Sequence, residues 1–176
     1  MRDHSTLDYT DRAHFYRELI SEMTGMLERP WFTNLATASA VLMQHLPDIN
    51  WVGFYLAVGA KDDAKGGIDD ELILGPFQGR PACLKIPSGK GVCGAAARAR
   101  KTLIVPDVEK FPGHIVCDSR SRSEIVVPLL LKDRLLGVLD VDSPILSRFS
   151  AEDRDGLEKV AQVLADRSWW PEQLHS

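Results

Sequence analysis

The spacing of apolar positions divides the chain into helical ends and a strand-rich middle. Near the N-terminus, apolar side chains recur every three or four residues, which is typical of amphipathic helices. This spacing predicts one helix over residues 11–28 and a second over residues 31–46, each followed by a proline that cannot continue it. The same spacing predicts a closing helix, and Ser150 and Asp153 at its start resemble an N-terminal capping box.

The period changes to two in the middle of the chain. Residues 51–56 alternate as a strand does, with plain apolar side chains on one face and two aromatic residues around a glycine on the other. Further strands are predicted at E-L-I-L-G, A-C-L-K-I, T-L-I-V, 125–131 and 135–141, and a short helix after the turn S-G-K-G. We expect an exposed hairpin loop over residues 59–70 and a long polar loop, of a kind that is often functional, over residues 106–123.

The order of these elements indicates an α+β fold. Two helices come first, then several strands with one short inserted helix, and then the closing helix. Because the connections between strands are of hairpin length, we expect an antiparallel sheet with helices packed against it. The 176 residues suit a single domain with a sizeable core, with residues 1–10 a flexible N-terminus and residues 168–176 a C-terminal tail.

Composition and charge narrow the range of partners. The net charge of -4 and the lack of a Lys/Arg stripe argue against nucleic acid, since phosphate contacts need clustered cations. The N-terminal residues are polar, unlike a secretory signal, and the longest apolar run, residues 125–131, is too short to cross a bilayer. An odd count of 3 cysteines does not suit a secreted disulfide framework. We therefore expect a cytoplasmic protein that binds neither nucleic acid nor membrane.

Three cysteines, Cys83, Cys93 and Cys117, are the first candidates for chemistry. Their spacing fits no common zinc motif, although His114 lies close before Cys117 and leaves a zinc site in this loop as an alternative. All three could also be small buried hydrophobic residues, which suits Cys93 in V-C-G-A-A. Cys117 differs because it lies in a polar loop with two arginines close behind it, and guanidinium groups favour the nucleophilic thiolate.

Two carboxylates, Asp140 and Asp142, are expected on one face of a strand. Side chains two positions apart along a strand point the same way, and neighbouring carboxylates repel each other unless something intervenes. A ligand ammonium group, a metal ion or a shared proton would each meet that need. Glu124 begins the neighbouring strand and is a third acid near the same place. The alternative is that the strand simply runs out into solvent at Asp142.

Two aromatic residues, Trp51 and Tyr55, flank Gly53 on one face of the first predicted strand. A glycine between two aromatic side chains leaves a gap with apolar walls, which could take a small apolar group or a cation. The commoner outcome is that helix residues fill such a gap as ordinary core.

Four segments together resemble the free methionine-(R)-sulfoxide reductases, which are GAF-domain enzymes. The segments are N-W-V-G-F-Y-L, L-G-P-F-Q-G-R-P-A-C-L-K-I-P-S-G-K-G-V-C-G, P-D-V-E-K-F-P-G-H-I-V-C-D-S-R-S-R-S-E-I-V-V-P-L and L-L-G-V-L-D-V-D-S-P-I-L-S-R-F-S. The similarity covers nearly the whole chain, and three cysteines at this spacing distinguish the reductases from ordinary GAF domains. The loop over residues 59–70 looks longer than in the family, and the C-terminal S-W-W-P-E-Q-L-H-S matches no motif.

The resemblance implies a fold and a thiol mechanism. The fold is a central six-stranded antiparallel sheet with the N- and C-terminal helices packed on one face. Cys117 matches the catalytic cysteine, Cys83 the main resolving cysteine and Cys93 an auxiliary one. Attack by Cys117 on the sulfoxide would release methionine and leave a sulfenic acid, which Cys83 would convert to a disulfide. Thioredoxin would then reset the enzyme, and no bound cofactor is implied.

The resemblance also implies how the substrate is held. Glu124, Asp140 and Asp142 match acids that hold the substrate, and Trp51 and Tyr55 match the aromatic walls of its pocket. Clustered carboxylates raise one another's pKa, so one of them, Glu124, could keep a proton for the leaving oxygen. The ammonium group of a free amino acid would pair with the acids, which a methionine inside a peptide cannot do.

Other GAF domains suggest an alternative hypothesis for the function of this chain. Many bind small ligands and regulate attached domains, so this chain could be a non-enzymatic ligand-binding or redox-sensing domain. An acid-lined pocket would, however, repel a phosphate-bearing ligand such as a cyclic nucleotide. GAF domains also pair through their terminal helices, which allows a homodimer, and the pair Trp169 and Trp170 points to a buried tail.

Overall fold

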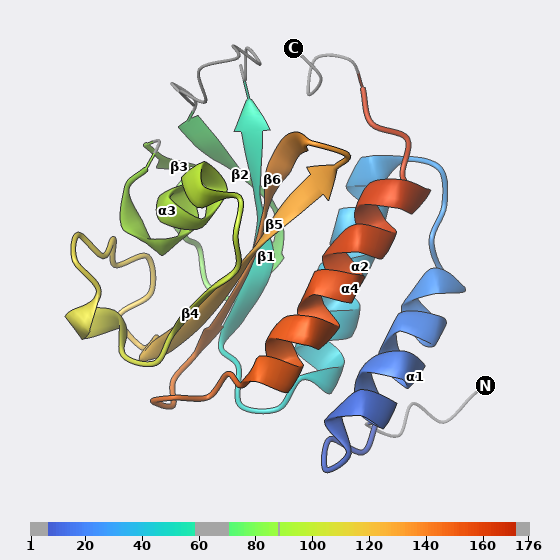
Figure 1. Ribbon diagram of the computed structural model, residues 1–176, viewed down its shortest axis with the longest axis horizontal. Helices are drawn as coiled ribbons and strands as arrows, with labels where there is room; N and C mark the ends of the chain where they lie inside the picture. Colours follow the sequence, from blue (N-terminus) through green and yellow to red (C-terminus); the bar gives the residue numbers. More distant parts are fainter. Residues whose placement is uncertain (1–6, 59–70, 88, 172–176) are drawn as a thin grey trace.

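A six-stranded antiparallel sheet separates the molecule into two faces (Figure 1). The computed structural model describes residues 7–58, 71–87 and 89–171, so the predicted loop over residues 59–70 and the outermost residues of both predicted termini lie outside the described residues. Within the described ranges the strands run in the order β3-β2-β1-β6-β5-β4. They are β1 (Trp51–Val58), β2 (Glu71–Gln78), β3 (Lys85–Ile86), β4 (Leu103–Val105), β5 (Ser123–Leu131) and β6 (Arg134–Ser143).

Three helices cover one face of the sheet, and a short helix lies on the other (Figure 1). On the first face α2 (Trp31–His45) and α4 (Ala151–Arg167) pack on the strands, and α1 (Arg12–Thr24) packs against these two helices. On the second face lies α3 (Gly91–Ala99). None of the helices in the described ranges combines the length and the apolarity that a bilayer span requires. The predicted α+β architecture, with the terminal helices on one face, is confirmed.

Alternation along the strands builds a separate core on each face. Val52 and Phe54 of β1 belong to the core beneath the three helices, whereas Trp51 and Tyr55 belong to the core beneath α3. The predicted partition of side chains between the two faces is therefore confirmed. The predicted capping box is also present, because the Ser150 side chain and the N-terminal turn of α4 exchange both hydrogen bonds.

Three local expectations differ from the structure. The first helix ends at Thr24 and not at residue 28, because the backbone turns at Gly25. The predicted strand A-C-L-K-I is reduced to Lys85–Ile86, and Cys83 before it is bonded to a distant loop. The tail is buried only in part: Trp170 stacks on Trp31, with ring centroids 5.5 Å apart, whereas Trp169 is exposed. Whether the chain forms a homodimer stays a prediction.

Candidate active site

A disulfide bond joins Cys83, just before β3, to Cys117, in the long loop before β5. Their Cα atoms lie 5.3 Å apart although 34 positions separate them in the sequence. The pairing that the resemblance implied is therefore confirmed. In this disulfide form His114 and Cys117 cannot make the alternative zinc site, since the Cys117 Sγ atom is bonded to a second sulfur.

Three carboxylates lie together on the face of the sheet that α3 covers. The register of β5 and β6 sets Glu124 directly opposite Asp142, and Asp140 lies two positions along β6 on the same face. Glu124 and Asp140 are buried, and Asp142 is half-buried. The strand therefore does not simply run out into solvent at Asp142. Strand pairing brings together the acids that the sequence only indicated to be near one another.

A small cavity connects the acids to the disulfide. Its lining comes from β3, α3, the loop before β5 and the two acid-bearing strands: Ile86, Gly91, Val92, Cys93, His114, Ile115, Cys117, Asp118, Ser121, Glu124, Asp140 and Asp142. Cys117 lines this cavity and Cys83 does not. The cavity has a free volume of about 20 Å³, which is room for about one water molecule. In the disulfide form the cavity is therefore too small for an amino acid.

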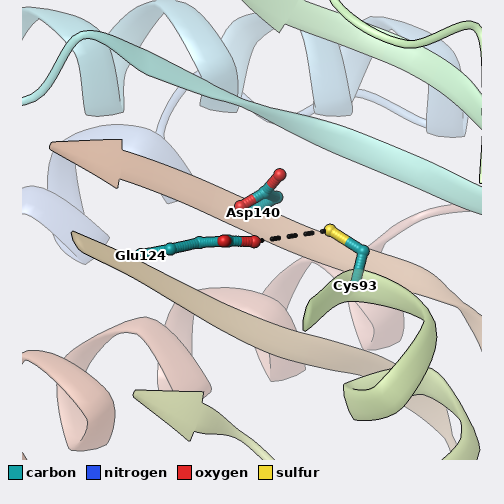
Figure 2. A group of neighbouring side chains, drawn as sticks. All are labelled: Cys93, Glu124 and Asp140. Atoms are coloured by element: carbon teal, nitrogen blue, oxygen red, sulfur yellow. Dashed lines mark hydrogen bonds between the residues drawn. The ribbon is translucent and has the colours of Figure 1, made fainter. Parts of the chain in front are cut away.

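Cys93, at the start of α3, contributes a thiol to the acid cluster (Figure 2). Its Sγ atom donates to Glu124 Oε1 over 3.9 Å. Cys93 Sγ and one carboxylate oxygen from each of Glu124 and Asp140 lie within 4.8 Å of one another. This spacing would allow a divalent cation to bind. Burial raises the pKa of Cys93 well above its ordinary value, so this cysteine stays a thiol.

Burial keeps protons on the carboxylates near neutral pH. It raises the pKa of Asp140 to about 7, and it raises the pKa of Glu124 well above its usual range, where the charge of Asp140 adds to the effect. Burial and the same charge also raise the pKa of Asp142. His114 Nε2 lies 3.9 Å from Glu124, but burial lowers the pKa of His114 and favours the neutral imidazole. The cluster can therefore act as an acid near neutral pH.

Tyr55 lies beside the disulfide and Trp51 stacks on Tyr55, but neither lines the cavity. The Tyr55 hydroxyl donates to the Cys83 carbonyl oxygen over 3.0 Å and lies 4.0 Å from Cys117 Sγ. Burial raises the pKa of Tyr55, so its hydroxyl keeps the proton that it can donate. The predicted gap at Gly53 is wrong: an added Cβ would overlap Phe77 of β2 and lie 2.7 Å from Trp51 Cη2. A neighbouring strand fills the space, and not a ligand or a helix.

The loop that carries Cys117 is held by polar contacts that the sequence did not reveal. The guanidinium group of Arg120 binds the Asp118 carboxylate, at 2.6 Å for the shortest contact, and so contacts an acid and not Cys117. That hydrogen bond holds the pKa of Asp118 well below its usual range. Asp118 thus competes with Cys117 for Arg120, and in the disulfide form the Tyr55 hydroxyl is a donor 4.0 Å from the Cys117 sulfur.

Asn50, the residue before β1, is the site residue that sequence reasoning missed. Its side-chain Nδ2 donates to Asp118 Oδ2 over 3.2 Å and to Ser121 Oγ over 3.1 Å. Its backbone N–H donates to the Asp142 carbonyl oxygen over 3.0 Å. Asn50 thus ties the cysteine loop to the acid-bearing strand. Its one sequence signal is a polar amide directly before an apolar strand, which is equally typical of a loop.

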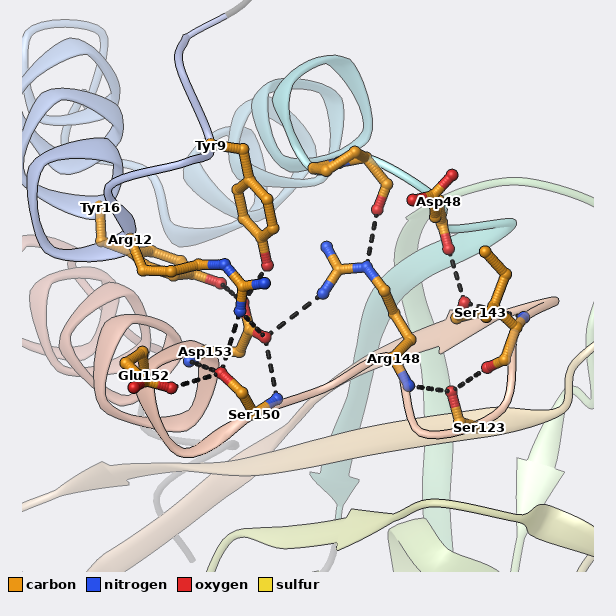
Figure 3. Close-up of polar contacts among 12 residues, drawn as sticks. Tyr9, Arg12, Tyr16, Asp48, Ser123, Ser143, Arg148, Ser150, Glu152 and Asp153 are labelled. Carbon is orange, nitrogen blue, oxygen red and sulfur yellow. Dashed lines mark hydrogen bonds and ion pairs between the residues drawn. The ribbon is translucent and has the colours of Figure 1, made fainter.

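On the helical side of the sheet, the buried carboxylate of Asp153 holds several segments together (Figure 3). Asp153 of α4 is fully buried and accepts from the Tyr9 hydroxyl and, over 2.9 Å, from the Tyr16 hydroxyl. It also forms ion pairs with Arg12, at 3.0 Å, and with Arg148, at 3.3 Å. One carboxylate therefore joins the N-terminal segment, α1 and the loop before α4.

Arg148 carries this network to the acid-bearing ends of β5 and β6 (Figure 3). Its Nε donates to the Pro47 carbonyl oxygen over 2.9 Å, and its backbone N–H donates to Ser123 Oγ over 3.3 Å. Ser123 pairs with Ser143 across the two strands, directly beside the pair of Glu124 and Asp142. The network thus fixes the strand ends from which two of the acids project.

Known proteins are similar to this chain in sequence and in fold. Residues 33–167 match the GAF domain family. The chain is 42% identical over 156 residues to the free methionine-R-sulfoxide reductase of Escherichia coli (strain K12), a match that covers 88% of each chain. It is 45% identical over 139 residues to the reductase of the same name from Saccharomyces cerevisiae, covering 76% of this chain and 73% of that protein. The X-ray structure of free methionine-R-sulfoxide reductase from Neisseria meningitidis, in complex with its substrate, superposes with a TM-score of 0.82 at 42% identity and covers 95% of both chains.

Removing the Asp153 carboxylate should destabilise the fold strongly. In Asp153→Ala the buried Arg148 loses its ion-pair partner, and breaking a buried ion pair costs about 3–5 kcal/mol. Urea unfolding followed by circular dichroism measures this loss. Asp155 is the matched control, because it is largely exposed and its surface ion pair is worth less than about 1 kcal/mol. Equal losses in Asp153→Ala and Asp155→Ala would contradict the structural role of the network.

Buried acids should make the stability depend on pH. The pKa of an unfolded Asp is about 3.9, and burial raises that of Asp140 to about 7. Between these values the folded state binds more protons, so the free energy of unfolding should fall by a few kcal/mol as the pH rises from about 4 to about 7. Asp140→Asn removes this titration, and its free energy of unfolding should decline less over the same range. Parallel curves for the parent and Asp140→Asn in denaturant unfolding would show that Asp140 has an ordinary pKa.

Proposed function

The chain belongs to the GAF-domain family of free methionine-R-sulfoxide reductases, and from that premise we propose that it reduces free L-methionine-(R)-sulfoxide to methionine with Cys117 as the nucleophile. The observation that carries this mechanism is the disulfide between Cys83 and Cys117 at the edge of an acid-lined cavity. A thiolate is a soft nucleophile that suits sulfur, and a buried acid suits the leaving oxygen. Both groups lie in one cavity once the disulfide is open.

The first step transfers the oxygen of the substrate to the enzyme. The Cys117 thiolate attacks the sulfoxide sulfur and forms a temporary bond between the two sulfurs, while the oxygen takes up a proton. The oxygen then passes from the substrate sulfur to Cys117 Sγ as the bond between the sulfurs breaks, which leaves a Cys117 sulfenic acid and releases methionine. Glu124 donates the proton that the oxygen requires, since its raised pKa keeps it protonated near neutral pH. The Tyr55 hydroxyl, 4.0 Å from Cys117 Sγ, supports the thiolate before the attack.

The second step converts the sulfenic acid into the disulfide. The Cys83 thiol attacks Cys117 Sγ, water leaves, and the two sulfurs are joined as in the present structure. Thioredoxin, an external dithiol, then returns both cysteines to thiols, and the enzyme itself needs no bound cofactor. Cys93 has only an auxiliary part in these redox steps, because its raised pKa keeps it a protonated, poorly nucleophilic thiol. The cytoplasm, where thioredoxin keeps thiols reduced, is the proposed location.

The acids also give a reason for choosing the free amino acid. Asp140 and Asp142 share one strand face and bind the substrate ammonium group. Trp51 and Tyr55, which stack on each other and do not line the small cavity of the disulfide form, become the aromatic wall for the apolar part of the substrate once the disulfide opens. Asp140 Oδ1 is buried and, among the described residues, accepts no hydrogen bond, so it is an acceptor that a ligand cation would satisfy. A peptide-bound methionine would leave these carboxylates unpaired.

Replacing the nucleophile should abolish turnover. Cys117→Ser should lower the rate of dithiol-dependent reduction of free methionine-(R)-sulfoxide by at least about 1000-fold, because a hydroxyl cannot replace the thiolate. Cys93→Ser is the matched control and should keep appreciable activity. Both rates are measured as methionine released, with the S epimer as a second substrate that should not react. A purely ligand-binding or redox-sensing domain would bind without turnover, and activity of Cys117→Ser equal to the parent would exclude the mechanism.

The catalytic efficiency should depend on the positive charge of the substrate, because Asp140 and Asp142 bind its ammonium group. Asp142→Asn should lower kcat/KM about tenfold or more, because a charge-assisted hydrogen bond is worth on the order of 1.5–3 kcal/mol. Glu124→Gln should instead lower kcat, since the amide cannot donate the proton. N-acetylation removes the positive charge of the substrate, so the parent should strongly prefer the free amino acid and Asp142→Asn should prefer it less. Similar efficiency of the parent on both substrates would rule out recognition of the ammonium group.

A further inference from the structure

The two most exposed large apolar side chains in the described part of the chain flank the disulfide. Leu84, 74% exposed, directly follows Cys83, and Val116, 64% exposed, directly precedes Cys117. The other exposed large apolar side chains belong to the ends of the helices or to the loop after β6: Met26, Phe32, Ile145, Leu146 and Trp169. Apolar surface is therefore concentrated at the redox bond, where catalysis gives no reason for it.

We call these two exposed side chains, one beside each cysteine of the disulfide, the Leu84–Val116 patch. The Cα atoms of the two cysteines lie 5.3 Å apart. Since each apolar residue is a sequence neighbour of a cysteine, the Cα atoms of Leu84 and Val116 are at most about 13 Å apart. Both therefore fit within the footprint of a single protein partner that reaches the disulfide.

We propose that the Leu84–Val116 patch is the docking surface for the protein dithiol of the thioredoxin type that reduces the disulfide. The inference rests on the proposed function, which requires an external dithiol in every cycle. Apolar side chains gain free energy only when a partner large enough to cover them removes them from water. A small thiol cannot do this, so the patch has a use only if the reductant is a protein.

The cavity indicates which sulfur the partner attacks. Cys117 faces the acid-lined cavity, which has room for about one water molecule and so leaves no path for a protein thiolate, whereas Cys83 is absent from the cavity lining. Attack at Cys83 Sγ expels the Cys117 sulfur, which lies 4.0 Å from the Tyr55 hydroxyl. A hydrogen-bond donor at the departing thiolate favours this direction of cleavage.

The exchange balances in two steps. First, a thiolate of the partner forms a bond to Cys83 Sγ while the bond between Cys83 and Cys117 breaks, and the electron pair remains on Cys117. Next, the second thiolate of the partner attacks its own sulfur in the mixed disulfide and releases the Cys83 thiolate. The partner is oxidised to a disulfide, the enzyme gains two electrons, and the two thiol protons of the partner pass to the enzyme thiolates.

The patch can be altered without moving the backbone that carries the disulfide. The Leu84 carbonyl oxygen accepts from the Leu74 N–H over 3.0 Å, and this bond does not involve the Leu84 side chain. Leu84→Ser, Val116→Ser and the double variant therefore remove apolar surface alone. Phe32→Ser is the matched control, because Phe32 is 57% exposed at the start of α2 on the opposite face of the sheet.

The experiment compares two reductants on the same enzymes. Turnover of free methionine-(R)-sulfoxide is measured with dithiothreitol and with recombinant thioredoxin, kept reduced by NADPH and thioredoxin reductase. The double variant should raise the KM for thioredoxin about tenfold and leave the rate with dithiothreitol within about twofold of the parent. Phe32→Ser should match the parent with both reductants.

Each other outcome has a definite meaning. If the parent fails with dithiothreitol, the proposed function is wrong. If the parent works with dithiothreitol but not with thioredoxin, or if the double variant matches the parent with thioredoxin, the function stands and the docking inference is overturned. Loss of activity with both reductants would also overturn it, because the patch would then act in the reaction itself.

Trapping provides a second readout that does not depend on rates. A thioredoxin variant that lacks its second active-site cysteine should accumulate a mixed disulfide with the oxidised parent enzyme, and peptide mapping should place that bond at Cys83. The double variant should form this adduct about tenfold more slowly at a thioredoxin concentration below the parent KM. A bond at Cys117, or equal rates for the two enzymes, would contradict the proposed docking.

Discussion

The chemistry of this fold depends on two carboxylates that are buried without a permanent cation. Glu124 and Asp140 are 5% and 6% exposed, and within the described ranges no Lys or Arg side chain forms an ion pair with either. Water cannot stabilise their charge there, so the free energy of the cluster is lowest when it holds protons or a cation. The same burial therefore has two consequences: the cluster acts as an acid near neutral pH, and it binds an ammonium group favourably.

The remainder of the structure maintains that burial and connects it to the redox bond. Pairing of β5 with β6 sets Glu124 opposite Asp142. The helix α3 covers the cluster and places the Cys93 thiol against Glu124. Asn50 ties the acid-bearing strand to the loop of Cys117. The Asp153 network holds the strand ends from behind, through Arg148 and Ser123. A site that needs fixed proton donors is therefore built on paired strands, and the cysteine that changes its bonding lies on a loop.

Much of this could be predicted from the sequence because strand alternation is a local property. The side chains of β1 and β6 divided between the two faces as their period of two required, and that placed Asp140 and Asp142 together. The capping box at Ser150 was equally local. The disulfide partner of Cys117 came from the family resemblance, since spacing alone left several states of the three cysteines open.

What the sequence could not provide depends on which of several available partners a side chain contacts in the folded chain. Arginine next to Cys117 in the chain suggested a thiolate partner, but a nearer carboxylate, Asp118, binds Arg120. Gly53 suggested an open gap, but Phe77 from another strand fills it. The role of Asn50 depends on Asp118 and Ser121, two residues of one loop more than 60 positions away. The partners of Gly53 and Asn50 come from distant segments, whereas Asp118 is a local competitor two positions from Arg120.

The central claim is that the cluster of Glu124, Asp140 and Asp142 keeps a proton at neutral pH. The direct measurement is carbon NMR of the enzyme with labelled Asp and Glu carboxyl groups, titrated from about pH 4 to about pH 9. At least one resonance should remain that of a protonated carboxyl group at pH 7, and Glu124→Gln and Asp140→Asn should identify it by loss or shift. Titration of every Asp and Glu carboxyl group below about pH 5 would contradict the claim.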